Sequence, residues 1–218
     1  MKKPNHFYRI TMLILCVSIV ACATPTRPPA VALKKFSEPA PIINFQVVST
    51  DGVDGVHAVY RSGQPKGDAD WAYLQKIGVK TVVKLNEYAS EVDASEELRA
   101  AKLHNINVIP IYMPPEDFPK NLNLWAHPEE KAIMKAVEAL ENNENLPVLV
   151  HCSHGKDRTG LVVAVYSVRN KNYCKDAAIN EMKYYGTNNL LFGLKPMLDS
   201  PSVVQSAGCT HEFTDQQR

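Results

Sequence analysis

The stretch that decides the fold reads "LPVLVHCSHGKDRTG" and spans residues 146–160. It opens with a short apolar run that is typical of a buried strand, and "TGLVVAVYSVRN", residues 159–170, continues as an apolar helix. Cys152 stands where the strand ends, so its thiol is a packed core group, a metal ligand or a nucleophile. The residues around it and the rest of the chain decide between these roles.

Strands and helices are predicted to alternate at short intervals on both sides of this stretch. Hydrophobic patterning predicts further strands at 43–48, 56–61, 79–85 and 106–113, and further helices at 68–78, 128–142 and 175–186. One more helix is expected to be capped by Asp93, with Glu96 three residues later. This alternation predicts an α/β fold with a central, mostly parallel sheet flanked by helices on both faces. Ligands of such sheets collect at the carboxyl ends of the strands, where the loop after residue 151 lies.

The loop between the strand and the helix has the composition of an oxyanion cradle. Backbone N–H groups at a helix start have no intrahelical partner, and the helix dipole adds attraction for an anion. Gly155 and Gly160 allow the backbone to bend and pack closely, and the Arg158 guanidinium matches two oxygens of a tetrahedral anion. The same groups favour the thiolate of Cys152, which would then be a nucleophile facing phosphorus.

Two neighbours of the cysteine have predicted supporting roles. The hydroxyl of Thr159 is expected to donate a hydrogen bond to the sulfur of Cys152 and to make it a better leaving group. His151 either holds the loop, biases Cys152 toward the thiolate, or faces the neighbouring core. A metal site made of His151, Cys152 and His154 is disfavoured, because these residues are too close together to form one tetrahedral set. We therefore expect neither a metal ion nor a cofactor.

The segment "HCSHGKDRTG" resembles the H-C-x-x-G-x-x-R-[S/T]-G signature of cysteine-dependent protein tyrosine and dual-specificity phosphatases. "VYRSGQP", residues 59–65, and the helix and strand after it resemble the opening of the atypical dual-specificity phosphatases. The resemblance covers residues 42–190 and implies the fold of those enzymes, with Cys152, Arg158 and Thr159 as catalytic residues. It implies substrate contacts from the remaining loop residues, which are Ser153, His154, Gly155, Lys156, Asp157 and Gly160.

The resemblance also implies a carboxylic acid on an upstream loop, which protonates the leaving oxygen. "YMPPEDFPKN", residues 112–121, follows a predicted strand, and its prolines keep it from forming a helix. Asp117, 35 residues before Cys152, is the preferred acid, and Glu116 is the alternative. The predicted reaction forms a cysteinyl-phosphate, which water then cleaves with help from the Asp117 carboxylate.

The loop is only a partial guide to the substrate. Lys156 at its rim either contacts a second phosphate, as on an inositol ring, or pairs with a nearby carboxylate, and Arg61 is expected to brace the loop. The sequence thus predicts a phosphomonoester hydrolase acting on phosphotyrosine, phosphoserine or phosphothreonine proteins, or on inositol phosphates or phosphoinositides. The alternatives are a rhodanese-like sulfur transferase, which needs no acid loop, and a non-catalytic module that binds phosphorylated ligands.

The N-terminal residues 1–21 are predicted to be a signal peptide. Basic residues precede the apolar run 10–20, which is too short for a comfortable transmembrane span. "IVAC", residues 19–22, resembles a bacterial lipobox, which implies a lipid on Cys22 and cleavage before it. The proline-rich residues 22–41 are then a tether and 42–218 the phosphatase domain. We expect an exported, membrane-anchored lipoprotein of the bacterial cell envelope, on the periplasmic side; an ordinary cleaved signal and an uncleaved anchor are the alternatives, and both also export the domain.

Charge and cysteine content limit the partners of the exported chain. The whole sequence carries a formal net charge of +1, and loss of residues 1–21 removes three basic residues and no acidic ones, which leaves −2. No basic run stands out, so we expect no nucleic-acid partner. We also expect a monomeric protein. Because an exported compartment is usually oxidising, Cys174 and Cys209 are a candidate disulfide pair that leaves Cys152 free.

Overall fold

The computed structural model describes residues 40–50, 57–87, 90–113, 130–171, 173–187 and 198. The chain divides into two units, Met1–Ala30 and Val31–Arg218, and all of these residues belong to the second. The strands are β1 (Gln46–Thr50), β2 (Ala58–Ser62), β3 (Thr81–Lys84), β4 (Asn107–Pro110) and β5 (Val148–His151). The helices are α1 (Gly67–Lys76), α2 (Glu91–Leu103), α3 (Glu130–Glu141), α4 (Asp157–Asn170) and α5 (Lys175–Tyr184), with a short 3-10 turn at Asn143–Asn145. In this part of the chain, no helix combines the length and the apolar character needed to cross a bilayer.

The five strands form one sheet in the order β1-β2-β5-β3-β4. β5 lies in the middle and runs parallel to β2 and β3, β4 runs parallel to β3, and only β1 pairs antiparallel, with β2. The predicted, mostly parallel sheet is therefore confirmed. Ser62 and Lys84 both lie beside His151 in the register, so three strand ends are level where the nucleophile loop begins.

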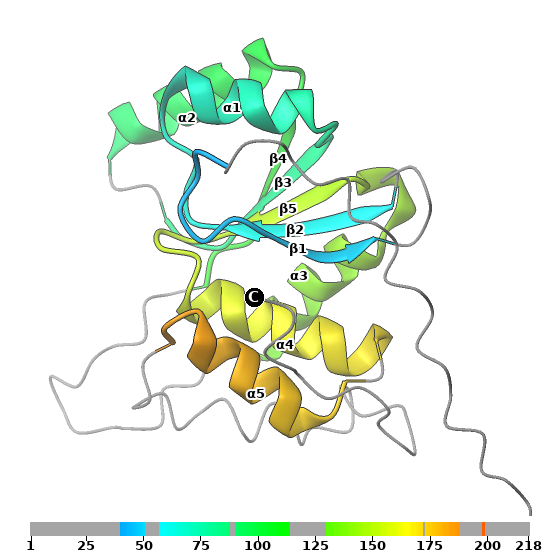
Figure 1. Ribbon diagram of the computed structural model, residues 1–218. Helices are drawn as coiled ribbons and strands as arrows, with labels where there is room; N and C mark the ends of the chain where they lie inside the picture. Colours follow the sequence, from blue (N-terminus) through cyan, green and yellow to red (C-terminus); the bar gives the residue numbers. More distant parts are fainter. Residues whose placement is uncertain are drawn as a thin grey trace, which may run out of the picture. The chain divides into compact units, whose positions relative to one another are not determined.

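Helices cover both faces of the sheet, as the alternating pattern predicts. α1 and α2 lie on one face, and α3, α4 and α5 lie on the other (Figure 1). The first face is closed by apolar side chains of α1 and the sheet, among them Trp71, Leu74, Val82 and Leu149. The second face buries the predicted stripe of α3, Ile133, Val137 and Leu140, against Val150 and Leu161. Each such side chain contributes about 1.5–3 kcal/mol by leaving water, which holds the layers together.

The start of α2 differs from the prediction that Asp93 caps it. Ser90 is the N-cap, with extended backbone, and its Oγ accepts a hydrogen bond from the Asp93 N–H at 3.1 Å. Asp93 lies instead in the first turn, where its carboxylate accepts a hydrogen bond from the Gln64 side chain at 3.3 Å. A carboxylate in the first turn still favours the helix start through the dipole. Asp93 therefore does mark the start of α2, but it lies one turn after the residue that caps the helix.

The boundaries of α4 and α3 also bear on the site. α4 begins at Asp157, two residues before the predicted start, so Arg158 and Thr159 lie in its first turn. The described part of α3 begins at Glu130. The predicted start of that helix at Pro128 lies outside the described residues.

We expect the substitution Ser90→Ala to lower the free energy of unfolding by about 1 kcal/mol, because it removes the cap of α2. Ser95→Ala is the matched control, because the hydroxyl of Ser95 only donates back to the Val92 carbonyl on the exposed helix surface. Urea unfolding followed by circular dichroism measures both variants. Equal stability of the two would contradict the assignment of Ser90 as the cap.

Candidate active site

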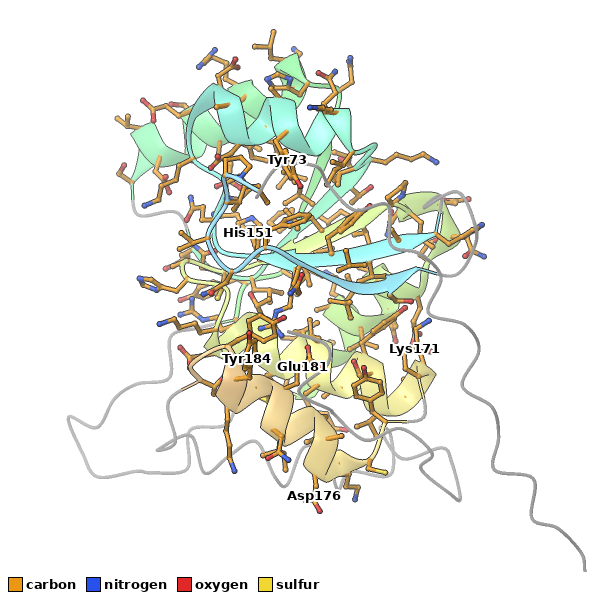
Figure 2. The ribbon with its side chains drawn as sticks, in the orientation of Figure 1. Tyr73, His151, Lys171, Asp176, Glu181 and Tyr184 are labelled. Carbon is orange, nitrogen blue, oxygen red and sulfur yellow. The ribbon has the colours of Figure 1, made fainter. Side chains whose placement is uncertain are left out.

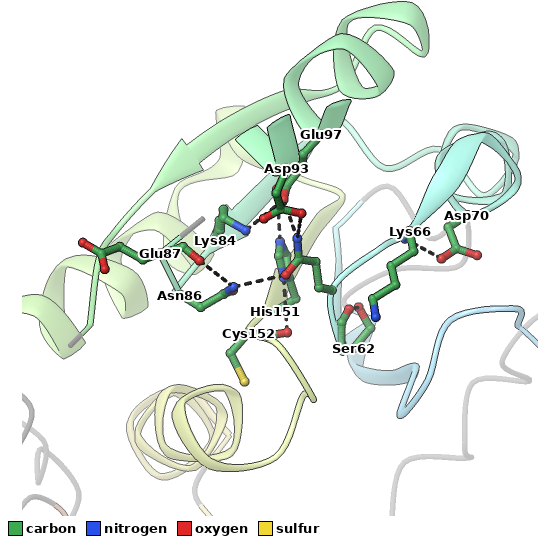
Figure 3. A network of polar contacts seen from close by, with 12 residues as sticks. Ser62, Lys66, Asp70, Lys84, Asn86, Glu87, Asp93, Glu97, His151 and Cys152 are labelled. Carbon is green, nitrogen blue, oxygen red and sulfur yellow. Dashed lines mark hydrogen bonds and ion pairs between the residues drawn. The ribbon is translucent and has the colours of Figure 1, made fainter. Parts of the chain in front are cut away.

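Cys152 directly follows the central strand β5 and opens the loop that leads into α4. Its side chain is 5% exposed, and its thiol is free. Cys174 is disulfide-bonded. Cys209, its predicted partner, lies outside the described residues. The sulfur of Cys152 points away from the polar network behind the loop (Figure 3). The pairing of Cys174 with Cys209 stays a prediction.

The four carbonyl groups of residues 153–156 all accept hydrogen bonds from residues outside the loop. The donors come from the β2–α1 loop, the segment before β1, β2, α4 and the segment after α5. In chain order, Ser153 O accepts from Gln64 N (3.3 Å), His154 O from Asn44 Nδ2 (2.8 Å), Gly155 O from an Arg61 guanidinium nitrogen (3.0 Å), and Lys156 O from Gly160 N (2.8 Å) and Thr187 Oγ1 (3.3 Å).

These outward carbonyls determine where the N–H groups of the loop point. In a planar trans peptide, the carbonyl of one residue and the N–H of the next point in opposite directions. Among the described residues, none of the N–H groups of residues 154–156 donates to a backbone carbonyl. The loop thus presents a set of donors on the side opposite its anchors, at the N-terminus of α4, where the helix dipole also attracts an anion. This geometry can bind a tetrahedral oxyanion.

Glycine is required at position 155 for two separate reasons. Its φ of +71° lies in the left-handed region that L side chains rarely adopt. A Cβ there would also lie 2.5 Å from the backbone of Ser62 and Gly63 at the end of β2. Gly160 has a milder role, because a Cβ on it would lie 3.2 Å from Thr187 Oγ1, where α4 meets the segment after α5.

Arg61 connects the loop to α5. It is 1% exposed, and its guanidinium donates to the Gly155 carbonyl at 3.0 Å and to the Glu181 carboxylate at 3.1 Å, while the Tyr185 ring lies 3.7 Å from its central carbon. Figure 2 shows Glu181 on the α5 side of the sheet. Burial lowers the pKa of Arg61 and raises that of Glu181, and their mutual attraction offsets this only in part. Arg61 therefore braces the loop, as the sequence analysis expected.

A buried polar network lies behind the loop (Figure 3). His151 is fully buried; its Nδ1 lies 3.4 Å from the Cys152 carbonyl and its Nε2 3.7 Å from Glu97 Oε1. Glu97 Oε2 accepts hydrogen bonds from Lys84 Nζ at 2.8 Å and from Gln64 Nε2 at 3.0 Å. Sequence reasoning missed Glu97 and Lys84; the one available signal was a lysine inside the apolar strand "VKTVVKL".

The ionisation of Glu97 reflects these neighbours. Burial by itself raises the pKa of this carboxyl, but the contacts with His151 and Lys84 outweigh burial, and the net pKa lies below its usual value. A carboxylate whose pKa is lower in the folded state stabilises the fold at neutral pH. That contribution is lost as the pH falls through the folded pKa, below the ordinary value of 4.5.

The other predicted site residues line the same loop. Arg158 is half-buried, and its guanidinium makes no ion pair or hydrogen bond within the described ranges. Thr159 is fully buried, and its Oγ1 has no hydrogen-bond partner there, so the expected bond to the Cys152 sulfur is not formed in this structure. The Lys156 side chain lies beside Gly186, after α5.

The remaining predicted residues comprise three substrate contacts in the loop and the candidate acids. His154 is exposed, and Ser153 and Asp157 are half-buried, so all three are at the rim of the loop. Asp117 and its alternative Glu116 lie outside the described residues.

A sequence model described as "Tyrosine phosphatase family" matches residues 41–190, which is more than half of the chain. The chain belongs to this family. It is 35% identical over 136 residues to a protein of Debaryomyces hansenii whose name provisionally assigns it as the tyrosine-protein phosphatase OCA1, covering 60% of this chain and 64% of that one. It is 32% identical over 147 residues to the inositol diphosphatase DSP2 of Oryza sativa, covering 66% and 63%. The matches thus span less than two thirds of each relative.

A solved structure of the catalytic core of Siw14 has the same fold. It superimposes with a TM-score of 0.58 at 21% sequence identity and covers 76% of this chain and 90% of that one. At this identity the likeness concerns the fold, which is the predicted dual-specificity-phosphatase-like sheet with helices on both faces.

We expect Gly155→Ala to abolish oxyanion binding and to destabilise the fold by more than Gly78→Ala. Both positions have positive φ, which costs an L residue about 1–2 kcal/mol, but a Cβ at Gly78 meets nothing within 4 Å. The comparison therefore isolates the clash with the end of β2. Thermal unfolding with and without tungstate measures both stability and anion binding; equal losses with retained tungstate binding would contradict this account of the loop.

Proposed function

We propose that this protein is a phosphomonoester hydrolase that works through a cysteinyl-phosphate intermediate. One observation carries the proposal: a free cysteine begins a loop whose four carbonyls are anchored outward, so that its N–H groups face the other way at a helix N-terminus. Arg158 follows in the first turn of α4. Membership of the tyrosine phosphatase family supports the same chemistry.

The proposed reaction has two steps at the same sulfur. The Cys152 thiolate attacks phosphorus, forming an S–P bond as the P–O bond to the leaving group breaks, while Arg158 and the loop N–H groups hold the other phosphate oxygens. Asp117 gives its proton to the leaving oxygen. Water then attacks phosphorus and the S–P bond breaks, with the Asp117 carboxylate accepting the proton of the water. Thr159 is proposed to donate to the departing sulfur.

We propose phosphorylated proteins or inositol phosphates and phosphoinositides as the substrate class. The names of the relatives support both: one is provisionally named a tyrosine-protein phosphatase and the other an inositol diphosphatase. Lys156, half-buried at the loop rim, is the candidate contact for a second phosphate. Phosphate release from phosphopeptides, inositol lipids and inositol hexakisphosphate, measured side by side, separates these classes.

We expect Cys152→Ser to abolish phosphate release from para-nitrophenyl phosphate, because the nucleophile is lost. Asp117→Asn should lower kcat by about 10²–10⁴-fold, because the leaving oxygen then departs without a proton. Glu116→Gln removes the alternative acid one residue away and should change kcat little; a large loss there with a full rate in Asp117→Asn would make Glu116 the acid. A full rate in Asp117→Asn would argue against this acid, and together with thiosulfate-dependent sulfur transfer it would favour the rhodanese-like alternative.

We also propose that the chain is an exported lipoprotein anchored through Cys22 to a membrane of the cell envelope. The support is the basic residues 2, 3 and 9, the apolar run 10–20 and the cysteine that ends it. The residues that match the family begin at 41, so the proposed signal peptide and nearly all of the tether precede the matched part of the chain.

We expect the full-length protein expressed in bacteria to fractionate with membranes and to incorporate labelled palmitate. Cys22→Ser should lose the label, because the lipid is attached to that thiol. Cys16→Ser, inside the same apolar run, is the control and should keep it. Incorporation of the label into Cys22→Ser would show that this cysteine is not the lipid site.

A further inference from the structure

Glu97 is a buried carboxylate that the proposed reaction does not use. It lies on α2 and is 4% exposed. Its two oxygens lie close to side chains from three different segments: Lys84 on β3, Gln64 in the β2–α1 loop and His151 on β5. Taking a carboxylate out of water is costly, so such a residue is maintained only where its neighbours compensate for that cost.

Two routes lead from Glu97 to the backbone around the nucleophile. In the first, His151 lies between Glu97 Oε1 and the carbonyl of Cys152, at 3.7 Å and 3.4 Å. In the second, the Gln64 side chain donates to Glu97 at 3.0 Å, and the Gln64 backbone N–H donates to the Ser153 carbonyl at 3.3 Å. Both routes end on carbonyls of consecutive residues, those of Cys152 and Ser153. The second route consists of hydrogen bonds, whereas the Glu97–His151 step of the first is a charge contact, because Glu97 Oε1 and His151 Nε2 have no hydrogen-bond partner among the described residues.

Lys84 compensates the buried negative charge of Glu97. It is 1% exposed, and its ammonium lies 2.8 Å from Glu97 Oε2. The pair is neutral as a unit, so it orients the neighbours of Glu97 without leaving an uncompensated charge behind the sulfur. Asp93, one turn earlier on α2, accepts a hydrogen bond from the same Gln64 nitrogen at 3.3 Å and supports the second route.

We propose that Glu97 is a positioning residue for Cys152, acting through His151 and Gln64 on the backbone that presents the sulfur. Its kinetic consequence rests on the proposed phosphatase function, but its effect on the sulfur does not. The reactivity of Cys152 toward an alkylating agent is therefore the primary readout, and turnover is the second.

The experiment measures the rate at which iodoacetamide alkylates Cys152 in the full chain at pH 7, with the modified peptide quantified by mass spectrometry. The variants are Glu97→Gln and the double variant Lys84→Met with Glu97→Gln, which removes both buried charges at similar volume. Glu141→Gln is the control: Glu141 accepts from Arg169 at 2.9 Å in an ion pair between α3 and α4. Circular dichroism and melting temperature report folding.

We expect alkylation of Cys152 and kcat on para-nitrophenyl phosphate to fall about ten- to hundredfold in both Glu97 variants, because misplacing a reacting group by about 1 Å can cost about 10²-fold. The control should match the wild-type protein in both. If Glu97→Gln does not fold, the alkylation rate of the double variant tests the proposal, because that variant leaves neither Lys84 nor Glu97 as an unpaired buried charge.

Three results separate the explanations. Slower alkylation in a folded Glu97 variant supports positioning, even if the wild-type protein releases no phosphate, in which case the proposed function alone fails. A lowered melting temperature with wild-type alkylation and kcat shows a purely structural role and overturns the proposal. Faster alkylation overturns it as well, because Glu97 would then restrain the sulfur by charge repulsion.

Discussion

The outward hydrogen bonds of four successive carbonyls, residues 153–156, are the constraint on which the site depends. A short loop has no regular ladder to hold its peptide planes, so their orientation comes from partners elsewhere. Here every carbonyl has such a partner, and the opposite N–H groups are left to face an anion. The loop can bind oxyanions because its other side is satisfied by the protein.

The partners come from segments that are distant in the sequence. Arg61 belongs to β2, Gln64 to the β2–α1 loop, Asn44 to the segment before β1, and Thr187 to the segment after α5. Burial disfavours the charges of Arg61 and its partner Glu181, yet the pair persists because each group is satisfied by the other and Arg61 also bonds the loop. The loop is thus stabilised by contacts that also join β2 to α5 and the start of α4 to the segment after α5, which couples the site to the surrounding fold.

Local patterns predicted most of the elements. β-branched runs identified the strands, and the apolar stripe of α3 is buried as expected. The start of α2 was misplaced because Ser90 and Asp93 are both suited to a helix N-terminus, and spacing alone does not tell a cap from a first-turn acid. The antiparallel β1 could not be foreseen either, because strand direction depends on pairing rather than on composition.

The sequence by itself determined the chemistry of the nucleophile loop. Cys152, Gly155 and Arg158 must follow one another within a few residues, because a single loop between a strand and a helix has to provide thiol, bend and guanidinium. Only the tertiary structure showed what supports that loop, since Lys84, Glu97 and His151 meet through the strand order and the packing of α2. The sequence does not show that Lys84 and Glu97 are buried together. Each is tolerated in the interior because it pairs with the other, and that contact forms only when β3 and α2 pack in the fold.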